Sequence, residues 1–277
     1  MRLTFCGVRG STPAPGAGFL RYGGSTSCVA VQANGQPVRL LLDGGTGLTA
    51  ASRLIDGPYD GHLLLGHLHW DHTHGMPFFA AGGRSGSRVR VVGPGQEGPL
   101  QSVLERAFSP PHFPITPDQL GAGWSFRGID EGTHQLGDFT VLAREIPHKG
   151  GRTFGYRITS GTSSIAYLSD HSPTSLGPGS DGLGVRHDAA MELAAGVDVL
   201  VHDAQHDAAE FPEVGYLGHA SASYAIALGR EAGARTVALF HHAPDRTVDQ
   251  VDALLTPVKN DDINVIATYE GLVLELP

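Results

Sequence analysis

Short apolar runs, bounded by glycine, proline and small polar residues, divide the chain into predicted β-strands. Three such runs near the start, at residues 3–8, 27–31 and 39–43, predict an antiparallel beginning. The run His62-Leu63-Leu64-Leu65 is apolar enough to be a short buried strand. Further strands are predicted at residues 88–92, 139–148, 154–158, 164–170, 197–203 and 236–242.

Helical patterns lie between these strands, at residues 48–55, 75–81, 99–108 and 221–232. Strands and helices alternate after residue 160, which is typical of an α/β architecture. The 277 residues are 40 % hydrophobic, which is enough for a large core, and no linker, charge block or low-complexity tract interrupts them. We therefore predict one domain over residues 1–277, built from two similar halves.

A dense group of polar residues follows the strand at 62–65. His67, His69, Asp71 and His72 lie within six residues, where a buried strand turns into a helix. This spacing lets four ligands converge on two neighbouring points, and neutral imidazoles with a carboxylate suit zinc, with manganese or iron as alternatives. The segment predicts a metal site.

Four later strands also end in histidine or aspartate. The predicted strands finish at His148, at Asp170, at His202-Asp203 and at His241-His242. Strand ends of this kind can meet at one edge of a fold, so the four together indicate a constellation more strongly than any one of them. His219-Ala220-Ser221 opens the helix at 221–232 and adds one more histidine.

The pattern His-x-His-x-Asp-His at residues 67–72 resembles the signature of the metallo-β-lactamase superfamily. The resemblance implies an αββα sandwich with one or two metals along one edge. It implies that Asp43 orients a metal histidine through its other ring nitrogen; a plain helix cap is the alternative. The implied ligands are His67, His69 and His148 for the first metal, Asp71, His72 and His241 for the second, and Asp170 bridging both.

Two further segments resemble motifs of ribonuclease Z and related phosphodiesterases. Leu200–Ala204 is similar to the His-Glu-Ala-Thr motif, and Gly218–Ser221 to the His-Ser-Thr motif. By this resemblance Asp203 orients His219, which protonates the leaving group. The chain departs from these motifs in having Asp203 in place of Glu and Ala220-Ser221 in place of Ser-Thr. The alternative is that Asp203 caps the end of a strand and that His219-Ala220-Ser221 caps a helix. Aligning Phe240–Pro244 by its proline selects His241 over His242 as the ligand, and leaves His242 to touch substrate or solvent.

The interval between the third histidine and the bridging aspartate bears on the substrate. The tRNA-processing members carry a long arm there, whereas only 22 positions separate His148 from Asp170. A net charge of −9 also argues against general nucleic-acid binding. The resemblance is therefore to the arm-less branch, and no grip on tRNA is expected.

These observations predict a dinuclear metal-dependent hydrolase. We expect a phosphodiesterase for small cyclic or nucleotide-like phosphodiesters, with two divalent ions (zinc, or alternatively manganese) and a metal-bridging hydroxide as nucleophile. Asp71, His219 and Asp203 are the expected catalytic residues. The alternatives are hydrolysis of a carboxylic ester, thioester or lactone on the same metals, and a non-hydrolytic metal-binding sensor.

The remaining features of the sequence bear on the location of the protein and on residues with two possible roles. The chain begins directly with a strand and has no run long enough to span a membrane, so we predict a cytoplasmic protein with no membrane partner; a homodimer is compatible with the sequence. The proline-rich loop at 109–116 either offers Phe113 or His112 to a substrate wall or is an inert connector. Surface or loop positions are expected for His62, His74, His112, His134, His171, His187 and His206.

Overall fold

The apolar runs form two seven-stranded β-sheets in the computed structural model, which describes residues 1–255 and 263–277. The first sheet has the order β14-β1-β2-β3-β4-β5-β6, and the second has the order β13-β12-β11-β10-β9-β8-β7. The strands of the first sheet are β1 (Arg2–Gly7), β2 (Cys28–Gln32), β3 (Leu40–Leu42), β4 (Asp60–Leu64), β5 (Arg88–Pro94), β6 (Trp124–Ile129) and β14 (Val273–Glu275). Those of the second are β7 (Gly132–Leu136), β8 (Phe139–Glu145), β9 (Phe154–Ser160), β10 (Ser163–Leu168), β11 (Val199–Asp203), β12 (Thr236–Phe240) and β13 (Asn264–Ala267).

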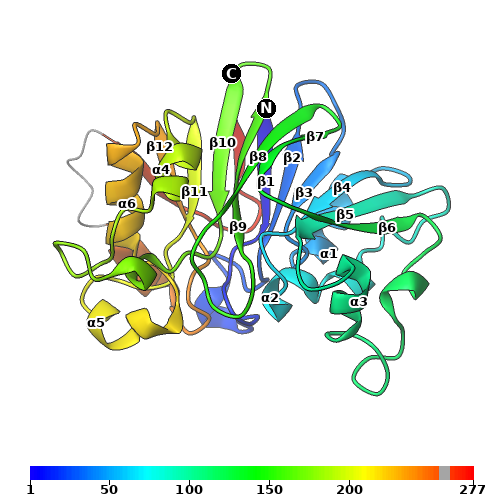
Figure 1. Ribbon diagram of the computed structural model, residues 1–277, viewed down its shortest axis with the longest axis horizontal. Helices are drawn as coiled ribbons and strands as arrows, with labels where there is room; N and C mark the ends of the chain where they lie inside the picture. Colours follow the sequence, from blue (N-terminus) through cyan, green and yellow to red (C-terminus); the bar gives the residue numbers. More distant parts are fainter. Residues whose placement is uncertain (256–262) are drawn as a thin grey trace.

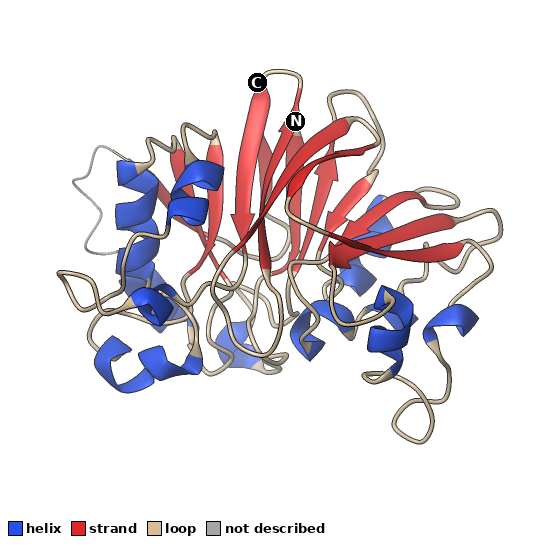
Figure 2. Cartoon of the chain, viewed as in Figure 1, coloured by secondary structure: helices blue, strands red, loops and turns tan. Residues whose placement is uncertain are grey.

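The helices cover the two outer faces of the paired sheets, as Figures 1 and 2 show. On the first sheet they are α1 (Leu48–Ala51) and α3 (Leu100–Glu105), and on the second they are α4 (Asp188–Ala194), α6 (Ala222–Glu231) and α7 (Val248–Leu254). The short helices α2 (Trp70–Thr73) and α5 (Phe211–Val214) lie toward the lower end of the strands in Figure 1. This is the αββα sandwich, so the predicted fold class is confirmed.

Three large apolar clusters hold these layers together, and a small fourth one joins Val251 of α7 to Tyr22 and Ala267. The central one lies between the sheets and joins residues such as Phe5 and Val31 to Phe139, Tyr167 and Phe240. A second lies between the first sheet and its helices, and a third between the second sheet and α4 and α6. Strands that are apolar on both faces are required here, because each sheet is covered on both sides.

The sheet topology brings the candidate functional residues to one edge of the sandwich. β3, β4, β5 and β6 are parallel to one another, and so are β10, β11, β12 and β13. The carboxyl ends of parallel strands meet at the same edge of a sheet. The polar residues that follow β3, β4, β10, β11 and β12 therefore gather at one end of the sandwich, near α2 in Figure 1.

Some element predictions differ from the structure. The helix predicted at 75–81 is a single 3₁₀ turn, Met76–Phe78, which ends because the backbone of Phe79, with φ −75° and ψ 84°, leaves the helical region. Strands predicted to reach His148, Asp170 and His241 end one to three residues earlier, so these residues lie on loops. Several elements were not predicted, because their burial alternates weakly or comes from packing against neighbours. They are the strands β6, β7, β13 and β14 and the helices α4, α5 and α7.

Candidate metal centre

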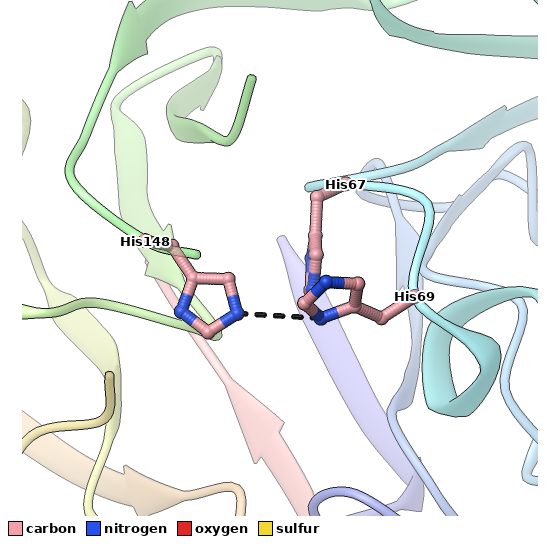
Figure 3. Close-up of side chains that lie close together, drawn as sticks. All are labelled: His67, His69 and His148. Atoms are coloured by element: carbon pink, nitrogen blue, oxygen red, sulfur yellow. Dashed lines mark hydrogen bonds between the residues drawn. The ribbon is translucent and has the colours of Figure 1, made fainter. Parts of the chain in front are cut away.

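Seven of the predicted ligands lie together at this edge. The side-chain nitrogens of His67, His69 and His148 form one group, as Figure 3 shows. Asp71, His72, Asp170 and His241 form a second group, and within each group the candidate ligand atoms lie within 4.8 Å of one another. Loops that are far apart in the sequence thus supply both groups.

Asp170 lies between the two groups. Its Oδ1 is 3.9 Å from His67 Nε2 and 3.7 Å from His148 Nε2, whereas its Oδ2 is 3.0 Å from His72 Nε2. His241 Nε2 is 3.3 Å from Oδ1. A carboxylate between the two ligand groups has the position that is required of a ligand to two ions.

The polar atoms at the centre are buried and lack hydrogen-bond partners. Within the described residues, neither ring nitrogen of His67, nor His72 Nε2, nor Asp170 Oδ2 makes a hydrogen bond. His72 Nε2 and Asp170 Oδ2 lie 3.0 Å apart and form an ion-pair contact, but not a hydrogen bond. Unpaired buried polar atoms cost about 1–3 kcal/mol each. Divalent cations would satisfy His72 Nε2, Asp170 Oδ2 and one ring nitrogen of His67, so this set of residues fits the metal ions that the fold implies.

The electrostatics differ between the two groups. Burial lowers the pKa of His67, His69 and His148, which keeps these imidazoles neutral, as metal ligation requires. Around the second group, burial opposes charge on His241, but Asp170 and Asp71 raise its pKa to about 9. The carboxylates of the second group therefore attract positive charge, which suits a cation.

Each histidine that could be a ligand of the second group is oriented by a neighbour. His72 Nδ1 donates to Asp43 Oδ2 over 2.7 Å, and Asp43 also accepts from Tyr167 Oη and the Gly66 backbone N, each at 2.7 Å. These contacts place Asp43 where the resemblance expects it, and they leave Nε2 of His72 directed at the site.

His241 and His148 are oriented in a different way. His241 Nδ1 donates to Gln205 Oε1 over 3.1 Å, and His148 Nδ1 donates to the Gly218 carbonyl over 2.8 Å. Sequence reasoning missed Gln205, although it lies only two residues after Asp203. Its place near a strand end that was already singled out is the signal that could have found it.

Backbone strain marks the same edge. Ser11, Asp43 and His241 have positive φ angles of 61°, 58° and 59°, and they are the non-glycine residues with positive φ within the described chain. Such conformations cost free energy and cluster at functional sites. The strained Ser11 donates its backbone N–H to Asp71 Oδ2 over 2.7 Å. A Cβ on the adjacent Gly10 would lie 2.3 Å from the His241 ring, so glycine is required there.

The expected acid pair is also in contact. His219 Nδ1 donates to Asp203 Oδ2 over 3.0 Å, and His219 is 9 % exposed. Asp203 is buried and also accepts from the backbone N–H groups of His171, Gln205 and Ala220. Burial opposes its ionisation, but His219 lowers the pKa of Asp203, so the carboxylate is charged.

The pair faces a cavity that also reaches the metal groups. This cavity has a volume of about 370 Å³ and is lined by Ser11, Leu68, His69, Trp70, Asp71, Asp170 and His219. His219 thus lies on the same cavity as three of the candidate ligands. With Nδ1 held by Asp203, its Nε2 is the nitrogen left for a substrate.

Other predicted contacts lie elsewhere. His242 is fully buried, donates Nε2 to the Thr268 carbonyl over 2.9 Å and packs against Tyr22, so it does not line the cavity, and neither substrate nor solvent reaches it. Phe113 and His112 line a separate apolar cavity of about 310 Å³ with Phe78.

Two of the spare histidines lie in loops, which is one of the two expected positions, but are not on the surface. His171 and His206 are buried. His171 Nδ1 lies 3.1 Å from His202 Nε2, behind Asp203. The loops after β10 and β11 are covered by α5 and α6, and local sequence carries no sign of that cover.

Comparison with known proteins agrees with this geometry. Residues 38–242 match the profile of the family described as Beta-lactamase superfamily domain. The chain belongs to that superfamily. This membership confirms the predicted family and the prediction of a metal-dependent hydrolase.

Similar proteins extend over the whole chain. Ribonuclease Z of Haloarcula marismortui is 25 % identical over 98 % of this chain and 96 % of its own length. The metallo-beta-lactamase fold protein YhfI from Bacillus subtilis superposes with a TM-score of 0.70 at 18 % identity, over 99 % of this chain and 98 % of its own. A diphosphatase from the PhnP family gives a TM-score of 0.68 at 20 % identity, over 100 % of this chain and 98 % of its own.

In residues 1–255 and 263–277, every helix is too short or too polar to reach across a bilayer.

Proposed function

We propose that this protein is a dinuclear phosphodiesterase for small phosphodiesters. The observation that carries the proposal is the shared cavity: His69, Asp71 and Asp170, from the two candidate metal groups, and His219, from the acid pair, line the same space. A purely structural metal site needs no such cavity and no acid beside it. The similar ribonuclease Z supports phosphodiester bonds as the class that is cleaved.

The proposed ligands follow the two groups. His67, His69 and His148 would hold one ion, Asp71, His72 and His241 would hold the other, and Asp170 would serve both. When bound, divalent ions lower the pKa of water toward neutrality and offset the charge of phosphoryl oxygens. Imidazole-rich groups favour zinc, with manganese as the alternative.

The protein's own residues then act on the leaving group. His219 presents Nε2 to the cavity and donates a proton to the departing oxygen, which would otherwise leave as an unstable alkoxide. Asp203 holds the ring in this orientation through Nδ1. Asp71 accepts a hydrogen bond from the Ser11 backbone N–H and lines the cavity, and its proposed role is that of a metal ligand.

The substrate is expected to be small. A cavity of about 370 Å³ has the size of a small-molecule site. Between His148 and Asp170 the chain forms only β9, β10 and their connections, so there is no arm to grip a tRNA. The net charge of −9 leaves the bound cations as the main source of attraction for a phosphodiester.

The test combines metal analysis with a substrate panel. Elemental analysis of the isolated protein should give about two divalent ions per chain. The metal-replete protein should hydrolyse bis(4-nitrophenyl) phosphate and a cyclic nucleotide faster than an aryl thioester or a lactone. Faster turnover of the thioester or the lactone would assign the site to carboxyl transfer, and no turnover of any of them would favour a sensor.

A further inference from the structure

Trp70 is a large apolar side chain exposed at the rim of the proposed active site. It is the first residue of α2, between His69 and Asp71, and its side chain lines the same cavity as Asp170 and His219. The residue is 64 % exposed. A large exposed aromatic residue beside a site is more informative than one elsewhere, because contact with a ligand would remove its surface from water.

The Trp70 ring is held in place from below. It stacks on the His74 ring one helical turn later, with a centroid separation of 5.3 Å and an interplanar angle of 19°. Its backbone is fixed by the helical turn that also positions Asp71 and His72. The indole therefore offers a flat surface next to the candidate ligands.

The lining of the cavity offers little else for an organic group to bind. Apart from the candidate ligands and His219, the residues lining it are Ser11, Leu68 and Trp70. A flat aromatic group can stack on an indole without any charged partner, and base–aromatic stacking tolerates every nucleobase. An aliphatic substituent would gain less from such a surface.

We propose that Trp70, backed by His74, is a stacking platform for the nucleobase of the substrate. This rests on the proposed function and narrows its substrate class to phosphodiesters that carry a nucleoside. The enzyme should favour substrates with a base over those without one, and should discriminate weakly among the bases. Phosphate is bound at the metal groups and the base on the indole.

Two substrates separate the contribution of the base from that of the phosphodiester. They are adenosine 2′,3′-cyclic phosphate and the 2′,3′-cyclic phosphate of 1-O-methylribose, which lacks a base. We expect wild type to show a higher kcat/KM on the adenosine compound. Trp70→Ala should lower that preference about tenfold, mainly through KM, which corresponds to about 1.4 kcal/mol. Trp70→Phe should retain most of it.

Phe78→Ala provides the matched control. Phe78 is 61 % exposed, close to the value for Trp70, but it lines the neighbouring apolar cavity instead. This variant should keep the wild-type preference. An unchanged preference in Trp70→Ala, or an equal fall with Phe78→Ala, would overturn the platform while leaving phosphodiester hydrolysis intact.

A binding measurement tests the platform without turnover. The chain has two tryptophans, so Trp124→Phe leaves Trp70 as the indole fluorophore. Adenosine 5′-monophosphate should quench its fluorescence in the metal-replete protein, and ribose 5-phosphate should not. Equal quenching by both would overturn the proposal. Quenching by the nucleotide alone, with no hydrolysis of any phosphodiester, would instead overturn the proposed function.

Discussion

Replacement of His219 by alanine gives the sharpest test of the acid assignment. An alkyl or ribose oxygen is a poor leaving group and needs a proton in the transition state, whereas nitrophenolate is already a stable anion. A positioned imidazole contributes roughly 10²–10⁴-fold in such steps. His219 is nearly buried and is fixed by a 3.0 Å hydrogen bond to Asp203, so we expect about 10³-fold.

The selectivity of the loss is the decisive readout. His219→Ala should lower kcat about 10³-fold on a cyclic or dialkyl phosphodiester, and much less on the 4-nitrophenyl ester. Metal content, measured on the same preparations, should not change. His112→Ala, which removes an exposed histidine from the neighbouring apolar cavity, is the control and should behave as wild type. Equal losses on both substrate types would give His219 a binding or structural role.

Asp203→Asn tests the orienting half of the pair. Asp203 Oδ2 accepts from His171 N, His219 Nδ1 and Ala220 N, and Oδ1 accepts from Gln205 N. An asparagine that keeps its oxygen at the Oδ2 position turns its NH₂ toward the Gln205 N–H, so one buried donor meets another. We expect a loss of about 1–3 kcal/mol in the free energy of unfolding. Urea denaturation measures this loss, and the leaving-group selectivity should be a weaker version of that in His219→Ala.

Four other outcomes follow from the contacts described. Asp170→Ala should lower metal occupancy in both groups by elemental analysis, and full occupancy with normal activity would remove Asp170 from the site. Asp43→Asn turns an amide NH₂ toward a donor and should weaken metal binding about 10–100-fold in chelator competition; unchanged affinity would contradict its role in orienting His72. Hydrogen bonds from Arg88 and Arg90 lower the pKa of Asp60 from 3.8 to about 2, so its stabilising effect is complete well above pH 4 and is lost as the pH falls through 2. Asp60→Asn should therefore cost up to about 1 kcal/mol at pH 7 and much less at pH 2, where the carboxylate is half protonated, measured by urea unfolding of chelator-treated protein; an equal cost at both pH values would refute the linkage. Precursor tRNA should not be cleaved at physiological salt, and specific 3′ processing would show that the missing arm is not needed.

Local sequence was sufficient for features that depend on neighbours in the chain. The apolar runs predicted most strands of both sheets, because burial on two faces leaves a continuous apolar signal. The cluster at residues 67–72 was visible because its members are supplied by one turn. The later candidates His148, Asp170 and His241 were found through strand ends, and the sheet topology brings those ends to one edge, with β10 and β12 in the parallel part of the second sheet and β8 in its antiparallel part.

Only the tertiary structure shows why one of two adjacent residues faces the site, a choice that the sequence made by resemblance alone. His241 and His242 are adjacent, yet a left-handed backbone at His241 directs its ring to Asp71 and Asp170, while His242 packs against Tyr22 on the other side. Gln205 follows β11 and His241 follows β12, and the two side chains meet because these strands are neighbours in the sheet. Side-chain direction at a strand end depends on backbone strain and on packing from distant elements, and neither leaves a pattern in the local sequence.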